Sequence, residues 1–510
     1  MPVSVTYPGI YIEEMQTTVH TIQGVDTSTT AFIGTAKKGP TNQATKINNF
    51  IEYENIFGGL WEKSNMSYAV YQYFLNGGQD ALIVRVHDGA KAARYEIGRS
   101  NLKLQASNAG MWGTNLDIRV NHNLYDINNV SNNSKKYDNE IFFSLTVKDT
   151  LTTSCEIFHN LSNNQNDERF IGDILNKYSN LIRVSRYISK EKRPPKGRFK
   201  LVKNSASDGK YSLADNIIVG KRGASSTGMY SLKAPNEFNM LCIPPYNKNN
   251  VTSKSVYVKA LEYCESRGAI LIVDSSDKWT AATDIEKEFG DLRSPNAVLY
   301  FPRIKAPDPL KEDSSLRSFV SSGGVAGVIA RTDATRGIWK APAGIEATLV
   351  GVSTLTVMLT DNEIDILTKK GVNCLKKNGV GGIIVGGART MSSEDKAQWK
   401  YLPIRRTALY IEESLYRGTQ WVVFEPNDES LWSKIRLNVS AFMIDLFRKG
   451  AFEGSTPDKA FFVKCDKETT SQDDIDRGIL NIVVGFAPLK PAEFVIIKIQ
   501  RLAGQKQNME

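Results

Sequence analysis

Histidine is scarce in this chain, and its positions limit the chemistry that the sequence can support. There are four histidines, His20, His87, His122 and His159, and none follows residue 159. Ser-His-Asp and Cys-His catalysis needs an imidazole base beside the nucleophile, so the rest of the chain cannot build such a site by itself. His122 and His159 lie in or beside an Asn-rich segment, where solvated surface histidines are expected. The sequence therefore predicts a protein that is not an enzyme.

Cysteine and glycine patterns add no reactive site. The five cysteines are scattered and form no C-x-x-C pair, so neither a disulfide framework nor a structural zinc site is expected, and buried free thiols are the simpler interpretation; they are Cys155, Cys242, Cys264, Cys374 and Cys465. The glycine-rich segments 321–327 and 379–387 lack the Gly-Lys-Ser/Thr of a phosphate-binding loop. Turns and close packing explain them better. We expect no catalytic residue, no metal and no cofactor.

Composition points to a soluble protein of several domains. A chain of 510 residues is too long for one ordinary core, so two or three domains are expected. No apolar run approaches the roughly 20 residues that span a bilayer, and the first 14 residues contain no basic segment followed by an apolar one. We therefore expect no membrane insertion and folding in the cytoplasm. The net charge of +9 is dilute, and its densest basic run, at 190–203, lies in a Pro-containing connector, so nucleic-acid binding is not expected.

The elements that would position any site follow an α/β rhythm. Strands predicted at 239–243, 269–273 and 297–300 are separated by predicted helices at 256–267 and 279–289, which indicates a mainly parallel sheet. An Asn-rich stretch with alternating strands and long polar loops indicates a mostly β insertion. We assign the first part of the core to 26–94, the outer insertion to 95–220, a central α/β domain to 221–361 and a C-terminal α/β domain to 362–490.

A long helix is predicted in the C-terminal domain, at 428–449. Apolar residues recur there at three- and four-residue spacing, which is typical of one buried helix face: Leu431, Ile435, Val439, Phe442, Met443 and Leu446. Lys434, Arg448 and Lys449 lie off that face. A strand is predicted further on, at 480–486.

Both chain ends are predicted to be strands. Val3, Val5 and Tyr7 alternate with polar residues, and residues 493–499 are apolar on both faces, with Phe494 and Ile496 on one and Val495, Ile497 and Ile499 on the other. A terminal strand must pair with a sheet edge, and a neighbouring copy can supply that edge. If their own sheet offers no edge, the strands within 1–25 and 491–510 could pair with a neighbouring copy.

Four stretches of the chain match a known family in sequence and in order. They are YPGIYIEE at 7–14, NAGMWGTNL at 108–116, VAGVIARTDATRGIWKAP at 325–342, and the region 405–452 with FEPN at 424–427. The chain resembles contractile tail sheath proteins, which occur in contractile phages, tail-like bacteriocins and contractile injection systems.

The resemblance implies a fold, a function and partners. The central domain would be subtilisin-like in topology without protease activity, and the C-terminal domain would lie nearest an inner tube. The resemblance also implies that 1–25 and 491–510 are linking arms, which would join copies into six-fold helical rings. These rings would contract and drive the tube through a target envelope. Partners would be other sheath subunits, the inner tube protein, and baseplate and tail-terminator proteins. The subunit would assemble in the bacterial cytoplasm, within a phage tail or a phage-tail-like particle that is released or membrane-anchored.

Three cations and two other functions remain open at this stage. The resemblance assigns Lys434, Arg448 and Lys449 to the tube-facing surface, with solvated positions or contacts to another sheath copy as the alternatives. A self-assembling shell or adhesin-type protein would also use terminal strands for pairing. A subtilisin-related hydrolase would need a histidine from the insertion.

Overall fold

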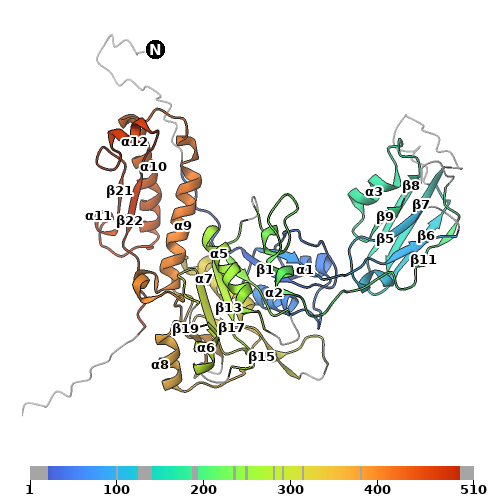
Figure 1. Cartoon of the computed structure of the whole chain (residues 1–510), viewed down its shortest axis with the longest axis horizontal. Coiled ribbons are helices and arrows are strands. Elements are labelled where there is room, and N and C mark those ends of the chain that lie inside the picture. The colour runs from blue at the N-terminus through green and yellow to red at the C-terminus, as the bar shows by residue number, and fades with distance from the viewer. Residues whose placement is uncertain are drawn as a thin grey trace, which may run out of the picture. The chain divides into compact units, whose positions relative to one another are not determined.

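The structure of the chain, a computed structural model, describes residues 21–98, 102–124, 141–186, 193–233, 237–246, 251–279, 282–289, 292–312, 315–379 and 382–493 (Figure 1). The chain separates into two compact units. The larger unit contains Asp26–Thr335 and Pro342–Leu402, and the smaller contains Met1–Val25, Arg336–Ala341 and Pro403–Glu510. The predicted linking strands lie outside the described residues, with Val3, Val5, Tyr7, Phe494, Val495, Ile496, Ile497 and Ile499.

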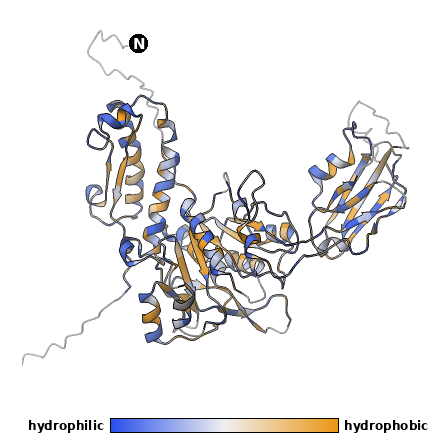
Figure 2. Ribbon diagram, in the orientation of Figure 1, coloured by the Kyte–Doolittle hydropathy of each residue, from blue (hydrophilic) through white to orange (hydrophobic). Residues whose placement is uncertain are grey.

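A nine-stranded sheet forms the centre of the larger unit, in the order β17-β20-β19-β14-β13-β12-β1-β3-β2. Its strands are β1 Thr30–Gly34, β2 Thr45–Ile47, β3 Ala81–Arg85, β12 Met240–Cys242, β13 Ile270–Asp274, β14 Ala297–Phe301, β17 Thr348–Leu349, β19 Val372–Lys377 and β20 Ile383–Val385. The six strands from β19 to β3 pair in parallel, and β2, β20 and β17 pair antiparallel at the two edges. Strands β1, β3, β13 and β14 are buried at every position, as expected for parallel strands covered on both faces. Hydrophobic residues are accordingly concentrated on this sheet (Figure 2). The predicted α/β class is confirmed.

Helices of the larger unit pack on this sheet. They are α1 Phe50–Phe57, α2 Asn65–Leu75, α4 Asp215–Val219, α5 Lys254–Ser266, α6 Ala282–Phe289, α7 Ser322–Arg336 and α8 Asp361–Lys369. Tyr257 of α5 and Leu367 of α8 share one apolar core with Leu271 of β13. A further three-stranded sheet contains β15 Ile304–Pro307, β16 Leu316–Phe319 and β18 Thr354–Leu355.

The glycines of segment 321–327 lie in helix α7 rather than in a turn. A Cβ at Gly323 would come within 2.0 Å of the Ala69 carbonyl oxygen, and one at Gly327 within 2.4 Å of the Tyr73 carbonyl oxygen. Close packing of α7 against α2 therefore explains these glycines, despite their poor helix propensity. In the second glycine-rich segment, 379–387, residues Ile383–Val385 form strand β20, and Gly386 after it is closely packed, because a Cβ there would come within 2.6 Å of the Cys374 carbonyl oxygen.

The insertion is a β-sandwich. Its two four-stranded antiparallel sheets have the orders β10-β6-β7-β8 and β11-β4-β5-β9 and enclose a common apolar core. The elements are β4 Arg94–Glu96, β5 Lys103–Ala106, β6 Leu116–Asn121, β7 Phe142–Asp149, β8 Cys155–Ser162, α3 Ile171–Tyr178, β9 Ile182–Arg186, β10 Gly197–Arg198 and β11 Lys200–Leu201. The chain enters and leaves this sandwich at adjacent points, because Lys91 and Ser207 exchange backbone hydrogen bonds of 2.8 and 3.0 Å.

The smaller unit is built around a long helix. Its elements are α9 Leu402–Gly418, α10 Glu429–Arg448, α11 Pro457–Ala460, β21 Phe461–Lys464, α12 Gln472–Asp476 and β22 Val483–Phe486. Asp428 caps the N-terminus of α10 by accepting a bond from the Leu431 N–H. All six residues of the predicted apolar stripe are buried, so that prediction is confirmed. Within the described residues, no helix is long and apolar enough to cross a membrane. Short 3-10 helices lie at Met111–Asn115, Gly228–Ser231, Glu394–Trp399 and Gln420–Val422.

Candidate functional site

Among its described residues, the smaller unit has one sheet, of two strands. β21 and β22 are antiparallel, with Phe461 opposite Phe486 and Lys464 opposite Val483. In the part of the chain that the structure describes, no third strand joins them. A two-stranded sheet has two free edges, and each edge presents backbone groups to which a strand from another chain can bond.

The hydrogen bonding of β22 shows which of its backbone groups face outward. The Ala487 N–H donates to the Ala460 carbonyl oxygen at 2.8 Å, so residue 487 faces β21. This direction alternates along an antiparallel strand. The N–H and C=O groups of Val484 and Phe486 therefore point away from β21, toward the free edge.

The same alternation gives the free edge of β21. It directs the backbone groups of Phe461 and Val463 outward. The Phe461 N–H bonds to the Pro457 carbonyl oxygen at the end of α11. Val463 therefore offers both its donor and its acceptor at this edge, and Phe461 offers its acceptor.

The two faces of this sheet differ in cover. Phe461, Val463, Val484 and Phe486 pack against the apolar core of the smaller unit, which includes the buried face of α10. On the opposite face Phe462 is 51% exposed and Val483 is 44% exposed. Strand β21 was not predicted; its signal is the short apolar run Phe461 to Val463, which follows Pro457. Of the strand predicted at 480–486, residues 483–486 form β22.

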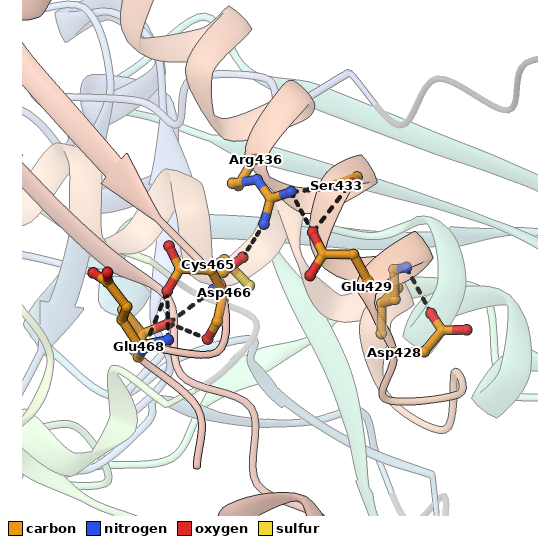
Figure 3. Close-up of polar contacts among 9 residues, drawn as sticks. Asp428, Glu429, Ser433, Arg436, Cys465, Asp466 and Glu468 are labelled. Carbon is orange, nitrogen blue, oxygen red and sulfur yellow. Dashed lines mark hydrogen bonds and ion pairs between the residues drawn. The ribbon is translucent and has the colours of Figure 1, made fainter. Parts of the chain in front are cut away.

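Polar contacts tie the end of β21 to helix α10 (Figure 3). The Arg436 guanidinium donates to the Cys465 carbonyl oxygen, to the Glu429 carboxylate at 2.7 Å and to the Ser433 hydroxyl at 2.9 Å. The Glu429 carboxylate raises the pKa of Arg436 further. Arg436 therefore holds the residue that follows β21 close to the first turns of α10, which fixes the position of the sheet edge.

Helix α10 also has an exposed stripe, and the three predicted tube-facing cations lie on or beside it. Lys434, Leu437, Ala441 and Arg448 are exposed and follow helical spacing. Lys434 and Arg448 are about 21 Å apart along the axis, and neither makes an ion pair with another residue that the structure describes. Lys449 is paired with Asp445 at 2.7 Å, and that contact raises its pKa.

A buried serine and carboxylate occupy the carboxyl end of β13, where a hydrolase site could be sought. The Ser322 hydroxyl donates directly to the Asp274 carboxylate at 2.7 Å, and the Ser322 N–H donates to it at 3.0 Å. Burial raises the pKa of Asp274 to about 6, although these bonds and Arg303 oppose the shift. In a Ser-His-Asp triad the imidazole stands between the hydroxyl and the carboxylate. Direct contact of the two is the arrangement of a helix cap and does not activate the serine.

The described histidines and cysteines offer no reactive group here: Cys242 lies beside Ser322, but burial raises the pKa of its thiol well above the usual value. His87 accepts a bond from the Ala90 N–H, and His122 contacts the Pro194 carbonyl oxygen. Burial raises the pKa of Cys374 to about 12 and that of Cys465 to about 11. Cys155 is exposed, so the expectation that all five thiols are buried was wrong there. Among the described residues, no group of three His, Cys, Asp or Glu side chains could hold a metal ion.

Two family models match the second half of the chain. Residues 225–391 match the model of the phage tail sheath protein central domain, and residues 394–501 match the model of the phage tail sheath C-terminal domain. Together these matches cover more than half of the chain. The chain belongs to the phage tail sheath family. The family predicted from the four sequence stretches is therefore confirmed.

Two curated sheath proteins are similar to parts of the chain. A putative prophage major tail sheath protein of Pseudomonas aeruginosa (strain UCBPP-PA14) is 26% identical over 236 residues, which is 45% of this chain and 57% of that protein. The tail sheath protein of Vibrio phage KVP40 is 24% identical over 177 residues, which is 34% of this chain and 25% of that protein. The alignments thus span about half and a quarter of the lengths of these relatives.

Solved sheath structures share the fold over nearly the whole chain. The contracted helical sheath of the anti-feeding prophage is 20% identical and covers 98% of this chain and 99% of its own, with a TM-score of 0.56. The contracted PVC sheath complex of an extracellular contractile injection system is 19% identical and covers 98% of both chains, with a TM-score of 0.57. A sheath tail protein of Listeria innocua is 13% identical and covers 92% of this chain and 96% of its own, with a TM-score of 0.61. The structural alignments therefore extend over the sandwich of this chain.

Proposed function

We propose that this chain is the structural sheath subunit of a contractile, phage-tail-like particle. It polymerises as six-fold helical rings around an inner tube and contracts to drive the tube through a target envelope. The observation that carries the proposal is the two-stranded sheet β21–β22, whose two edges no described strand occupies, in a chain with strands predicted near both ends. Family membership favours this function over a shell, an adhesin or a hydrolase.

The linking arms are proposed to pair with this sheet in neighbouring copies. Residues 1–25 and 491–510 each supply one strand, through Val3, Val5 and Tyr7 at one end and Phe494, Val495, Ile496, Ile497 and Ile499 at the other. Two added strands would occupy both free edges and give a four-stranded sheet drawn from several chains. Each backbone hydrogen bond contributes roughly 0.5–1.5 kcal/mol net, so one arm is a modest tie and many arms keep a lattice connected.

The exposed stripe of α10 is proposed to face the inner tube. Lys434 and Arg448 present two cations, which fit an acidic tube surface. Lys449 contributes less, because Asp445 already neutralises it. The wider setting is also proposed: contacts with baseplate and tail-terminator proteins, no nucleic acid, assembly in the bacterial cytoplasm, and a central domain of subtilisin-like topology without protease activity.

Electron microscopy of the expressed chain tests the assembly. Hollow six-fold helical cylinders, formed by the chain alone or with its tube protein, support the sheath function. Closed particles would support a shell instead. Peptidase activity that disappears when His122 or His159 is replaced would support the hydrolase.

Truncation of the arms tests the linking strands. Deletion of residues 1–9 or 493–510 is expected to leave a folded subunit that cannot build a sheath. Deletion of residues 125–140, a segment of similar length in the Asn-rich insertion, is the matched control and should leave assembly intact. Normal cylinders from either arm truncation would contradict the linking-strand proposal.

A further inference from the structure

One sheet of the outer sandwich has an outward face on which most side chains are cations. In β4 and β5 the side chains alternate, so Tyr95 and Leu104 are buried in the sandwich core while Arg94 and Lys103 point away from it. The strand register places five cations, one carboxylate and one amide on this face, which we call the basic sheet face: Arg94, Glu96, Lys103, Gln105, Arg183, Arg186 and Lys200. Strands β11, β5 and β9 of this layer are labelled in Figure 1.

The single carboxylate of the basic sheet face cannot balance its cations. Glu96 lies opposite both Lys200 and Lys103 in the register, and it bonds Lys103 at 2.6 Å. Arg94, Arg186 and Lys200 are exposed, and none of them makes an ion pair with another described residue. The face is therefore positive after its internal pairing is counted.

This charge is a cost to the fold rather than a support for it. Lys103 is paired with Arg186 on the neighbouring strand, where the register shifts, and like charges on paired residues destabilise a sheet. Burial lowers the pKa of Arg183, whose guanidinium bonds the Ile182 carbonyl oxygen at 2.7 Å. Residues 92–210 contain 19 Lys and Arg against 12 Asp and Glu, which is seven of the nine charges that the whole chain carries in excess. A surface under selection for solubility alone would intersperse the two signs, so the clustering favours an anionic ligand.

The chemistry of the face selects among anionic ligands. All seven of its side chains are charged or amide groups. Within the described strands it has no aromatic ring on which a base of single-stranded nucleic acid could stack. Its half-buried neighbour Val202, opposite Arg94, is too small to anchor the face in a bilayer. Strands about 4.8 Å apart, with same-face residues about 7 Å apart along each strand, arrange the cations as a flat grid. A flat grid of Lys and Arg suits a chain of sulfate or carboxylate groups.

We propose that the basic sheet face binds an acidic polysaccharide. The contacts are ion pairs from Arg94, Lys103, Arg186 and Lys200 to successive acidic groups of the glycan, and Gln105 donates to its hydroxyl groups. This inference concerns the outer sandwich alone and does not depend on the proposed assembly.

Binding of heparin, a sulfated polysaccharide, to the full-length chain tests the proposal. The face variant carries Arg94→Gln, Arg186→Gln and Lys200→Gln. The matched control removes the same charge from exposed positions elsewhere, with Lys148→Gln, Lys177→Gln and Lys311→Gln. At 0.1 M salt the face variant is expected to bind heparin about tenfold more weakly than the control, because three exposed ion pairs are lost. The dependence of its affinity on salt should also be shallower.

Three results would overturn the proposal. One is an equal loss of heparin affinity in the face variant and in the control, which would show that binding depends on the net charge of the chain and not on this face. The second is tighter binding by the unmodified chain to duplex DNA or to phosphatidylglycerol vesicles than to heparin. The third is a lower melting temperature for Arg186→Gln alone, because relief of the repulsion with Lys103 should leave that temperature unchanged or raise it.

Discussion

The substitution Val484→Pro tests strand pairing at the free edge of β22 without removing a bond between β22 and β21. The Val484 N–H points away from β21, whereas the ladder bonds of β22 are made by residues on either side of it, such as Gly485. Proline has no N–H and is tolerated in an edge strand where that group faces solvent. Val484→Pro is therefore expected to leave the subunit folded. Gly485→Pro, one residue later, removes a bond to β21 and is expected to destabilise the smaller unit.

The size of the assembly defect follows from the count of outward groups. A strand added to β22 can bond the N–H and C=O of Val484 and of Phe486, four bonds in all, worth about 2–6 kcal/mol net. The proline removes one donor, and its ring displaces the incoming strand at the other Val484 group. About half of that energy, 1–3 kcal/mol, is lost at each contact, which corresponds to about 5- to 150-fold weaker association.

The assay compares the two variants in parallel. Thermal melting of the dispersed subunit measures folding, and pelleting followed by negative-stain microscopy measures assembly. Val484→Pro should melt within a few degrees of the unmodified chain and form few or no cylinders. Unchanged cylinders would refute the pairing at this edge. A melting temperature as low as that of Gly485→Pro would refute the assignment of outward groups.

Two further changes address the larger unit. Burial raises the pKa of Asp274 to about 6, so the folded state holds this proton more tightly than the unfolded chain does, and the contribution of Asp274 to stability falls as pH rises from about 4 to 6. The unfolding free energy of the unmodified chain, relative to that of Asp274→Asn, should therefore be about 2 kcal/mol greater at pH 4.5 than at pH 7.5. A difference that chemical denaturation finds to be independent of pH would contradict the raised pKa. Gly323→Ala should cost about 1–3 kcal/mol, because its Cβ would meet the Ala69 carbonyl oxygen at 2.0 Å. Gly324→Ala should cost less, because the nearest atom to its Cβ is a flexible side-chain carbon of Leu349 at 3.0 Å. Equal melting temperatures of the two variants would count against close packing of α7 on α2.

The sequence predicted well those elements whose local pattern of apolar residues shows which positions are buried. The strand at Ile270–Asp274 is a continuous apolar run, as expected when both faces are covered. Helix α10 shows its buried face through residues three and four apart, and its start through the capping Asp428. In both cases one segment contains the whole signal.

The features of the fold that the sequence did not predict depend on contacts between distant segments. The sequence 321–327 is poor in helix-forming residues, and its helical state comes from packing of Gly323 and Gly327 on α2. The strand order of the large sheet places β1 beside β12, more than 200 residues later, and no local pattern specifies that neighbour. The assignment of the linking strands remains a prediction, because those residues lie outside the part that the structure describes.

The candidate site was only half visible in the sequence. The alternation of apolar and polar residues near the start of the chain, with the apolar run at 493–499, predicted strands that need a sheet edge for pairing. The strand predicted at 480–486 contains β22. The partner strand β21 has only four residues, which is too short for periodicity to identify. That its outer edge is free follows from the absence of a third strand among the described residues, which is a property of the fold and not of any segment.

The backbone hydrogen bonds between Lys91 and Ser207 hold the two ends of the sandwich together, so the sandwich is inserted in the larger unit as a separate module. Because the chain leaves the large sheet and returns to it at adjacent points, a different module with closely spaced ends can be exchanged there without altering the strand order beneath it. Evolution can then change the sandwich while the large sheet stays constant. The same junction offers a place to display a foreign domain once per subunit, with residues 92–206 as the segment to exchange.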